Sequence, residues 1–176
     1  GNIGRTVARV AEALGCRIAY TSTSGVVRKE PYPEKPLDEL LRWADVVSVH
    51  APLNDRTRNL IGARELALMK PSAILINVAR GGIVDETALA DALERGIIRG
   101  AAIDNFESEI PSPGNPLLRL SPEARRRVLF SPHLAGVTRA AFARLIRQAI
   151  GNLENSLRGL PPQFSVNGLS SIRPSA

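Results

Sequence analysis

Short apolar segments alternate with helix-like segments along most of this chain. Several of the helical patterns end at glycine or proline, and most of the apolar segments lack the polar alternation of a half-exposed strand. Continuous apolar strands separated by helices are typical of a parallel sheet with helices on both faces, so we predict a doubly wound α/β domain. The expected strands cover residues 17–21, 45–50, 72–78, 100–105 and 127–132, and the expected helices cover residues 5–14, 36–44, 63–70, 85–96 and 138–158.

The chain opens on a glycine turn, Gly1-Asn-Ile-Gly4, directly before the first predicted helix. In dinucleotide-binding folds, a G-x-G-x-x-G turn links the first strand to a helix whose N-terminal amides hold the pyrophosphate. Gly1 and Gly4 have the spacing of the second and third of these glycines. Gly1 would let the backbone approach the phosphates, and Gly4 would let the helix pack closely on the sheet. We therefore expect a Rossmann-type domain that is truncated at its N-terminus, so that the first strand is missing and the segment alone is poorly stable.

Composition and charge restrict the class of protein. The 44% hydrophobic content fits a folded globule, and no run of about 18 apolar residues is present, so we expect no membrane association. The single cysteine, Cys16, excludes an internal disulfide, fits a reducing, cytoplasmic compartment, and is expected to lie in the core. The net charge is +6, but the basic residues form no single stripe and only 4% of residues are aromatic. We therefore expect no nucleic-acid partner, but a general preference for anionic ligands.

Polar stretches that follow the predicted strands carry the residues suited to catalysis. An arginine such as Arg80 can hold a carboxylate through two hydrogen bonds. A histidine such as His133 can move a proton near neutral pH, and a neighbouring carboxylate such as Glu109 would orient it and stabilise its charged form. Together these groups suit proton transfer to or from the hydroxyl of an acid, beside a nicotinamide that accepts the hydride. The carboxyl edge of the predicted sheet is where open α/β sheets bind ligands.

These stretches resemble the motifs of the D-isomer-specific 2-hydroxyacid dehydrogenase family. The motifs are N-x-x-R-G-x-x-V-D at residues 77–85, D-x-F-E-x-E at residues 104–109 and S-P-H-x-x-G at residues 131–136, and the resemblance runs from Gly1 to about Leu157. It is nearest to the glycerate dehydrogenase or hydroxypyruvate reductase branch. It implies an NAD(P)-dependent oxidoreductase that acts on the CH–OH group of a small D-2-hydroxy acid or the corresponding 2-oxo acid. Glycerate and hydroxypyruvate are the first expectation, and glyoxylate is the second.

The resemblance also implies a role for individual residues of this sequence. Arg80 would bind the substrate's carboxylate and carbonyl, His133 would be the acid/base, and Glu109 would pair with it. Asp104 would either contact the cofactor or only position its loop, and no metal site is expected. The implied cofactor-binding residues are Gly1, Asn2, Ile3, Gly4, Thr21, Ser22, Ala51, Pro52, Thr57, Val78, Ala79, Arg80, Asp104, His133, Ala135 and Gly136.

Two positions depart from the usual pattern. NAD enzymes of this fold place an acid after the second strand to bind the ribose 2′-hydroxyl, but here the stretch 20–30 has hydroxyls, with Arg28 and Lys29 nearby. The missing carboxylate favours tolerance of NADP, whereas the resemblance favours NAD. NAD and NADP therefore both stay open, with NAD slightly ahead. Asn105 stands where the family usually has an apolar residue, and the sequence offers no reason for it.

The resemblance implies three parts of the chain and a larger parent protein. Residues 1–136 would form the incomplete dinucleotide-binding domain, residues 137–158 a long helix that rejoins the absent substrate domain, and residues 159–176 a loose tail. The parent protein would be a homodimer, and the chain alone would be inactive.

The main alternative is a non-catalytic dinucleotide-binding sensor, similar to the family's corepressor branch. The presence of Arg80, Glu109 and His133 together argues against it, because a sensor needs no complete set of proton-transfer residues. A formate dehydrogenase would carry a glutamine in place of Glu109.

Overall fold

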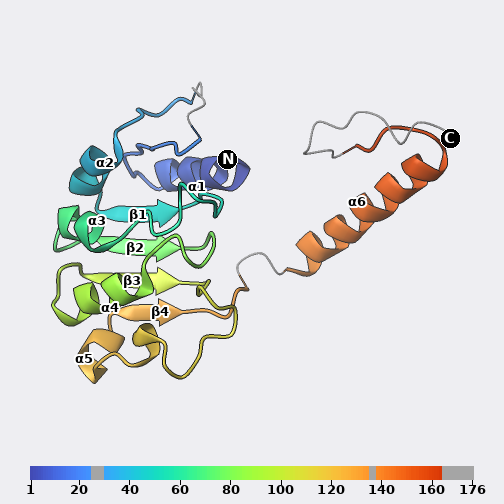
Figure 1. The fold of residues 1–176 in the computed structure, drawn as a ribbon. Coiled ribbons are helices and arrows are strands. Elements are labelled where there is room, and N and C mark those ends of the chain that lie inside the picture. The colour runs from blue at the N-terminus through green and yellow to red at the C-terminus, as the bar shows by residue number, and fades with distance from the viewer. Residues whose placement is uncertain (25–29, 135–137, 164–176) are drawn as a thin grey trace. The chain divides into compact units, whose positions relative to one another are not determined.

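The computed structural model of the protein describes residues 1–24, 30–134 and 138–163, and it contains two compact units, Gly1–Ala135 and Gly136–Ala176. In the first unit, helices and strands alternate along the chain from α2 onward (Figure 1). Its elements are α1 (Asn2–Ala13), α2 (Leu37–Trp43), β1 (Val46–Val49), α3 (Ala63–Leu68), β2 (Ile74–Asn77), α4 (Glu86–Glu94), β3 (Gly100–Ile103), the 3₁₀ turn η1 (Pro116–Leu118), α5 (Pro122–Arg125) and β4 (Val128–Phe130).

The four strands form one parallel sheet in the order β1-β2-β3-β4. Val47 of β1 pairs with Leu75 of β2, which pairs with Ala101 of β3, and Ala101 pairs with Val128 of β4. The predicted parallel α/β fold is confirmed. All four strands point the same way in Figure 1, so the loops that follow them lie along one edge of the sheet.

The core lies against one face of this sheet. On that face, Leu75 and Ile103 are at most 3% exposed, and they belong to one buried cluster with residues of α3 and α4 such as Leu66 and Leu93. Val46 and Leu129, which point to the opposite face, are 54% and 70% exposed. The face that carries Leu75 and Ile103 is thus buried, whereas Val46 and Leu129 on the other face are exposed.

Helix α4 begins and ends as the sequence predicts. The Asp85 carboxylate accepts hydrogen bonds from the backbone N–H groups of Thr87 (2.9 Å) and Ala88 (3.0 Å). These bonds satisfy amides that have no partner within the helix. After the last turn, Gly96 has φ 68°, a left-handed conformation that glycine adopts without strain.

The first predicted strand, residues 17–21, does not join the sheet, and this prediction is wrong. Only Tyr20 makes an isolated bridge, to Glu34. A strand is held by hydrogen bonds to a neighbouring strand, and among the described residues β1 pairs only with β2. Cys16, beside this segment, is exposed, so the expectation of a core cysteine is also wrong.

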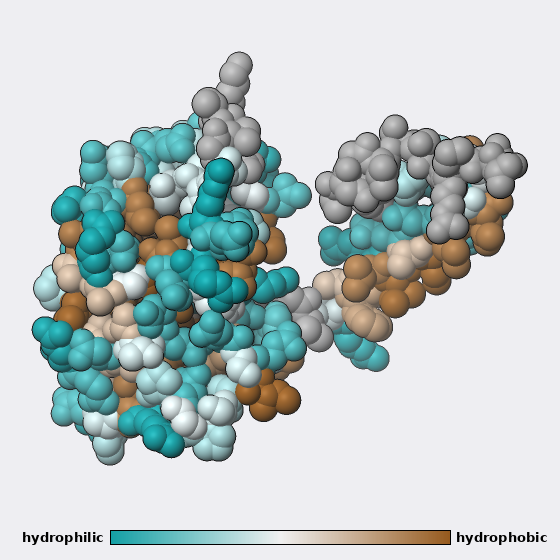
Figure 2. All heavy atoms as spheres, viewed as in Figure 1, coloured by the Kyte–Doolittle hydropathy of each residue, from teal (hydrophilic) through white to brown (hydrophobic). Residues whose placement is uncertain are grey.

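The second unit contains one described helix, α6 (Arg139–Leu157), which confirms the last predicted helix. The Thr138 hydroxyl accepts a hydrogen bond from the N–H of Ala141 (3.0 Å) and caps it. Apolar side chains form a band along one side of α6 (Figure 2), although Phe142 and Leu153 are 62% and 60% exposed. Most of the predicted tail, residues 164–176, lies outside the described residues.

Within the described parts of both units, no helix is long and apolar enough to cross a membrane.

Candidate active site

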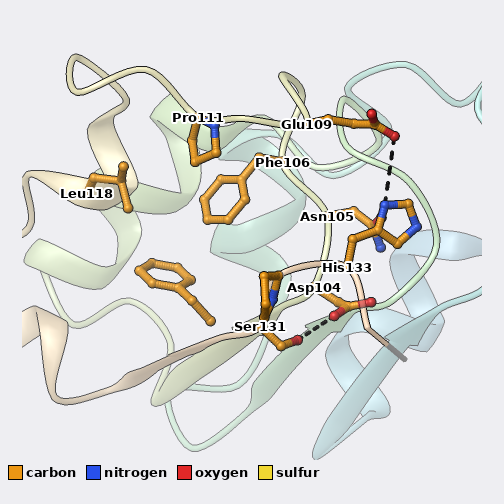
Figure 3. Close-up of a pocket in the computed structure, with 10 residues that line it drawn as sticks. Asp104, Asn105, Phe106, Glu109, Pro111, Leu118, Ser131 and His133 are labelled. Carbon is orange, nitrogen blue, oxygen red and sulfur yellow. Dashed lines mark hydrogen bonds and ion pairs between the residues drawn. The ribbon is translucent and has the colours of Figure 1, made fainter. Parts of the chain in front are cut away.

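His133 and Glu109 approach each other above the carboxyl ends of β3 and β4. The Glu109 Oε1 atom lies 3.9 Å from the His133 Nδ1 atom (Figure 3), which is too long for a hydrogen bond but close enough for an ion pair when the imidazole carries a proton. Both side chains are accessible, with exposed fractions of 87% for Glu109 and 46% for His133. Because Glu109 faces Nδ1, the other ring nitrogen, Nε2, is the one left for a substrate.

The His133 loop is anchored on Asp104. The His133 N–H donates to the Asp104 carbonyl oxygen (3.0 Å). The Asp104 carboxylate is buried, and it accepts hydrogen bonds from the Ser131 hydroxyl and from the N–H of Leu134. The Asp104 N–H in turn donates to the carbonyl of Asn77 at the end of β2 (3.0 Å). These contacts match the loop-positioning alternative for Asp104.

A cavity of about 270 Å³ adjoins the histidine and the carboxylate (Figure 3). Its lining combines Asp104, Glu109 and His133, which the sequence predicted, with mostly apolar side chains. Arg80, which follows β2, does not line this cavity. The lining residues are Asp104, Asn105, Phe106, Glu109, Pro111, Leu118, Phe130, Ser131, Pro132 and His133.

Arg80 is exposed on a loop that Asn77 shapes. The buried Asn77 amide donates to the Arg80 carbonyl (3.0 Å) and accepts from the Ala79 N–H (3.1 Å). The Arg80 guanidinium donates one hydrogen bond, to the Ala79 carbonyl (2.7 Å), among the residues that the structure describes, so other N–H groups could bind a ligand. Asn77 entered the sequence analysis only as a motif position, and its bracing role is visible only in three dimensions.

The Arg80 loop touches the loop that carries Glu109. A Cβ atom added to Gly81 would lie only 1.9 Å from the carbonyl oxygen of Phe106. Only glycine therefore allows the two backbones to approach this closely. The contact fixes the spacing between the two loops.

Glu86, at the start of α4, braces the Glu109 loop from the other side. Its carboxylate accepts hydrogen bonds from the Glu107 N–H (2.6 Å) and from the Asn115 side-chain amide (2.5 Å). The sequence analysis missed this role, because the partners lie 21 and 29 residues away and no local pattern reveals such a contact.

The N-terminus of α1 is suited to an anionic group. Gly1 is its N-cap, no side chain caps it, and its first turn contains no acidic residue. The amides of Asn2, Ile3 and Gly4 are thus the orphan donors to which a phosphate can bind. A Cβ atom added to Gly4 would lie 3.4 Å from the His50 side chain, so the glycine permits close packing beside β1. These features fit the pyrophosphate of a dinucleotide.

Next to α1, His50 is partly buried and lies within hydrogen-bond distance of the Ser48 hydroxyl (2.9 Å). Burial lowers the pKa of His50 below its ordinary value of 6.5. A neutral imidazole is therefore favoured at this position.

The other predicted cofactor residues have different environments. Thr21, Ser22, Ala51, Val78 and Ala79 are partly buried, Pro52 is exposed, and Ala135 and Gly136 lie outside the described residues, as do Arg28 and Lys29. Thr57 is fully buried and its hydroxyl donates to the Pro52 carbonyl (2.6 Å), so its side chain shapes the loop. An acid that the sequence analysis did not consider, Glu30, forms a two-oxygen contact with Arg5 of α1 (2.8 and 3.0 Å).

Residues 1–135 match the family described as D-isomer specific 2-hydroxyacid dehydrogenase, NAD binding domain. The chain belongs to this family. It is 44% identical over 170 residues to the glyoxylate reductase of Aeropyrum pernix, a match that covers 95% of this chain and 49% of that protein. The chain therefore spans about half the length of the curated relatives that it matches.

Solved structures show the same similarity for this dehydrogenase domain. A D-isomer specific 2-hydroxyacid dehydrogenase from Lactobacillus delbrueckii, in its NAD-complexed form, matches with a TM-score of 0.82 and 31% identity, over 95% of this chain and 53% of that one. An NADPH-dependent glyoxylate/hydroxypyruvate reductase from Sinorhizobium meliloti, in complex with NADP and malonate, matches with a TM-score of 0.87 and 29% identity, over 100% and 53%. Structures with NAD and with NADP thus both occur among its neighbours.

Proposed function

We propose that this domain belongs to an NAD(P)-dependent oxidoreductase that transfers a hydride between a nicotinamide cofactor and a small D-2-hydroxy acid or 2-oxo acid. The observation that carries the proposal is the His133–Glu109 pair, 3.9 Å apart, on the same sheet edge as Arg80. A proton donor, a carboxylate that stabilises it and a cation for the substrate's carboxylate are the groups that this reaction requires.

In the direction of reduction, His133 donates a proton from Nε2 to the oxygen that becomes the hydroxyl. Glu109 faces Nδ1, where its charge stabilises the protonated ring before transfer. Arg80 binds the substrate's carboxylate and orients the neighbouring carbonyl towards His133. The bound nicotinamide supplies the hydride. In the direction of oxidation, the neutral His133 accepts the proton at the same atom.

The amides of Asn2, Ile3 and Gly4 would hold the cofactor's pyrophosphate at the N-terminus of α1. Thr21 and Ser22 would lie near the adenosine ribose, and Ala51, Pro52, Val78 and Ala79 would shape the rest of the cleft. Both NAD and NADP stay candidates, because structures with each are similar to this chain. NAD keeps first place because the family resemblance of the sequence favours it.

Hydroxypyruvate and glycerate remain the first choice of substrate pair, and glyoxylate the second. Similarity to the glyoxylate/hydroxypyruvate reductase of Sinorhizobium meliloti supports both substrates, and similarity to the glyoxylate reductase of Aeropyrum pernix supports the second. Catalysis would also need the substrate domain, which the long helix of residues 137–158 would rejoin, and the parent enzyme would be a homodimer. The exposed apolar band of α6 supports such cover.

The test is reduction of 2-oxo acids by the full-length enzyme that contains this domain, followed by the absorbance of the reduced nicotinamide. Hydroxypyruvate, glyoxylate and pyruvate would be offered with NADH and NADPH separately. Oxidation of either cofactor by hydroxypyruvate supports the proposal, and the ratio of the two rates gives the cofactor preference. No oxidation with any of the three acids would contradict it.

A further inference from the structure

One buried amide nitrogen in the wall of the His133 cavity has no hydrogen-bond partner in the part of the chain that the structure describes. Asn105 is 6% exposed, and its Nδ2 atom contacts no acceptor among the described residues. An unpaired N–H buried in a protein costs free energy that an apolar side chain of similar size would avoid. The presence of an amide at this position therefore calls for an explanation beyond packing.

Asn105 shares its cavity with several apolar side chains. Phe106 and Leu118 line the same cavity with apolar side chains (Figure 3). Phe130 lines it too, and its ring lies 5.4 Å from that of Phe106. The cavity, of about 270 Å³, is several times larger than one water molecule, whose share of the liquid is roughly 30 Å³. There is room in it for a small organic ligand.

We propose that Asn105 recognises a hydroxyl group on carbon 3 of the substrate, so that the enzyme prefers 3-hydroxy-2-oxo acids to 2-oxo acids with an unsubstituted methyl group. This inference rests on the proposed function, in which His133 protonates the oxygen on carbon 2. Carbon 3 is bonded directly to carbon 2, and Asn105 lines the same cavity as His133 and Glu109.

A hydroxyl is the group that suits this amide best. A half-turn of the amide exchanges its nitrogen and oxygen, so Asn105 can present either a donor or an acceptor. A hydroxyl can take either role, whereas a methyl group can take neither and leaves the amide unpaired. A site that hydrogen-bonds a substrate hydroxyl discriminates strongly against an analogue that lacks it.

The test compares Asn105→Val and Asn105→Thr in the full-length enzyme. The two replacements have nearly the same shape, but only threonine keeps a polar group. We expect Asn105→Val to lower kcat/KM for hydroxypyruvate about tenfold or more, with kcat/KM for pyruvate unchanged or raised. Asn105→Thr should keep most of the preference. Glyoxylate, which has no carbon 3, should be affected equally little by both replacements.

Two further measurements separate recognition from a structural role. Asn105→Val should unfold at the same temperature as the wild type or higher, because it removes an unpaired buried N–H; a packing role for the amide predicts a lower temperature. Binding can be measured with the reduced cofactor and a 2-hydroxy acid, because these two do not react with each other. D-Glycerate should then raise the unfolding temperature of the wild type more than D-lactate does. Asn105→Val should abolish the difference.

If Asn105→Val leaves the ratio of kcat/KM for hydroxypyruvate to that for pyruvate unchanged, the inference is overturned while the proposed function still stands. A wild-type enzyme that reduces no 2-oxo acid would overturn both.

Discussion

His133 adopts a backbone conformation that residues other than glycine rarely adopt, with φ 54°. Such conformations persist only where the surroundings hold them, and they are frequent at functional sites. Here the hydrogen bonds to Asp104 hold the loop. The position of the ring therefore depends on the backbone rather than on Glu109, whose side chain is 87% exposed.

Replacing Glu109 should consequently affect chemistry more than folding. We expect Glu109→Gln to lower kcat about 10- to 100-fold, because the charge that stabilises the protonated imidazole is lost. The unfolding temperature should stay unchanged. Glu107→Gln is the matched control, since Glu107 is an exposed acid two residues away whose side chain contacts Arg58 instead. Equal kcat values in the wild type and Glu109→Gln would remove Glu109 from the mechanism.

Gly81 is a second residue at which a small change should have a large effect. In Gly81→Ala the new Cβ would lie 1.9 Å from the Phe106 carbonyl oxygen, so the two loops must move apart. We expect a loss of about 1–3 kcal/mol in the free energy of unfolding, together with a fall in kcat/KM, measured by urea unfolding and steady-state kinetics.

Gly151→Ala serves as the control, because among the described residues no atom outside the neighbouring stretch of its own helix lies within 4 Å of its added Cβ. Its stability should be unchanged or slightly increased, since alanine favours helix more than glycine does. Similar losses in both variants would argue against the loop contact.

At the scale of elements, the loop geometry depends on where α4 begins. Asp85 caps this helix, and Glu86, the next residue, braces the Glu109 loop. We expect Asp85→Ala to lower the free energy of unfolding by about 1 kcal/mol, because two amides at the helix start lose their acceptor. Urea unfolding measures the change. Asp91→Ala, which removes an exposed carboxylate from the same helix, should have a much smaller effect.

The packing of α1 beside β1 should make stability depend on pH. Burial lowers the pKa of His50 below 6.5, so the unfolded chain binds a proton more tightly than the folded chain does. The contribution of His50 is therefore fully present above pH 6.5 and is lost as the pH falls below it. We expect the unfolding temperature to drop less on acidification in His50→Gln than in the wild type, measured across about pH 5 to 8. Parallel curves for the two proteins would contradict this.

At the scale of the whole molecule, most elements could be predicted because their signals are local. The apolar runs of β2 and β3, the Asp85 cap and the glycine after α4 are all readable over a few residues. Residues 17–21 show the limit, since a strand pattern forms a strand only where a partner is present.

The candidate site divides in the same way between local and distant contacts. Arg80, Glu109 and His133 were identified from their motifs and from the rule that parallel strands end at one edge. Other features are visible only in three dimensions. They are the hydrogen bonds of Asn77 and Glu86, the close approach of two loops at Gly81, and the burial of the Asn105 amide. Local patterns carry no information about such contacts.

The central claim is that His133 transfers a proton during reduction of a 2-oxo acid. The most direct measurement is the absorbance of NADH or NADPH mixed with hydroxypyruvate and the full-length enzyme, for the wild type and for His133→Ala. We predict that the wild type oxidises the cofactor and that His133→Ala loses at least about 100-fold in kcat while a fluorescence titration shows that it still binds the cofactor. Oxidation by His133→Ala at the wild-type rate would contradict the claim, and so would a wild type that binds the cofactor but oxidises none of it, as expected for a sensor.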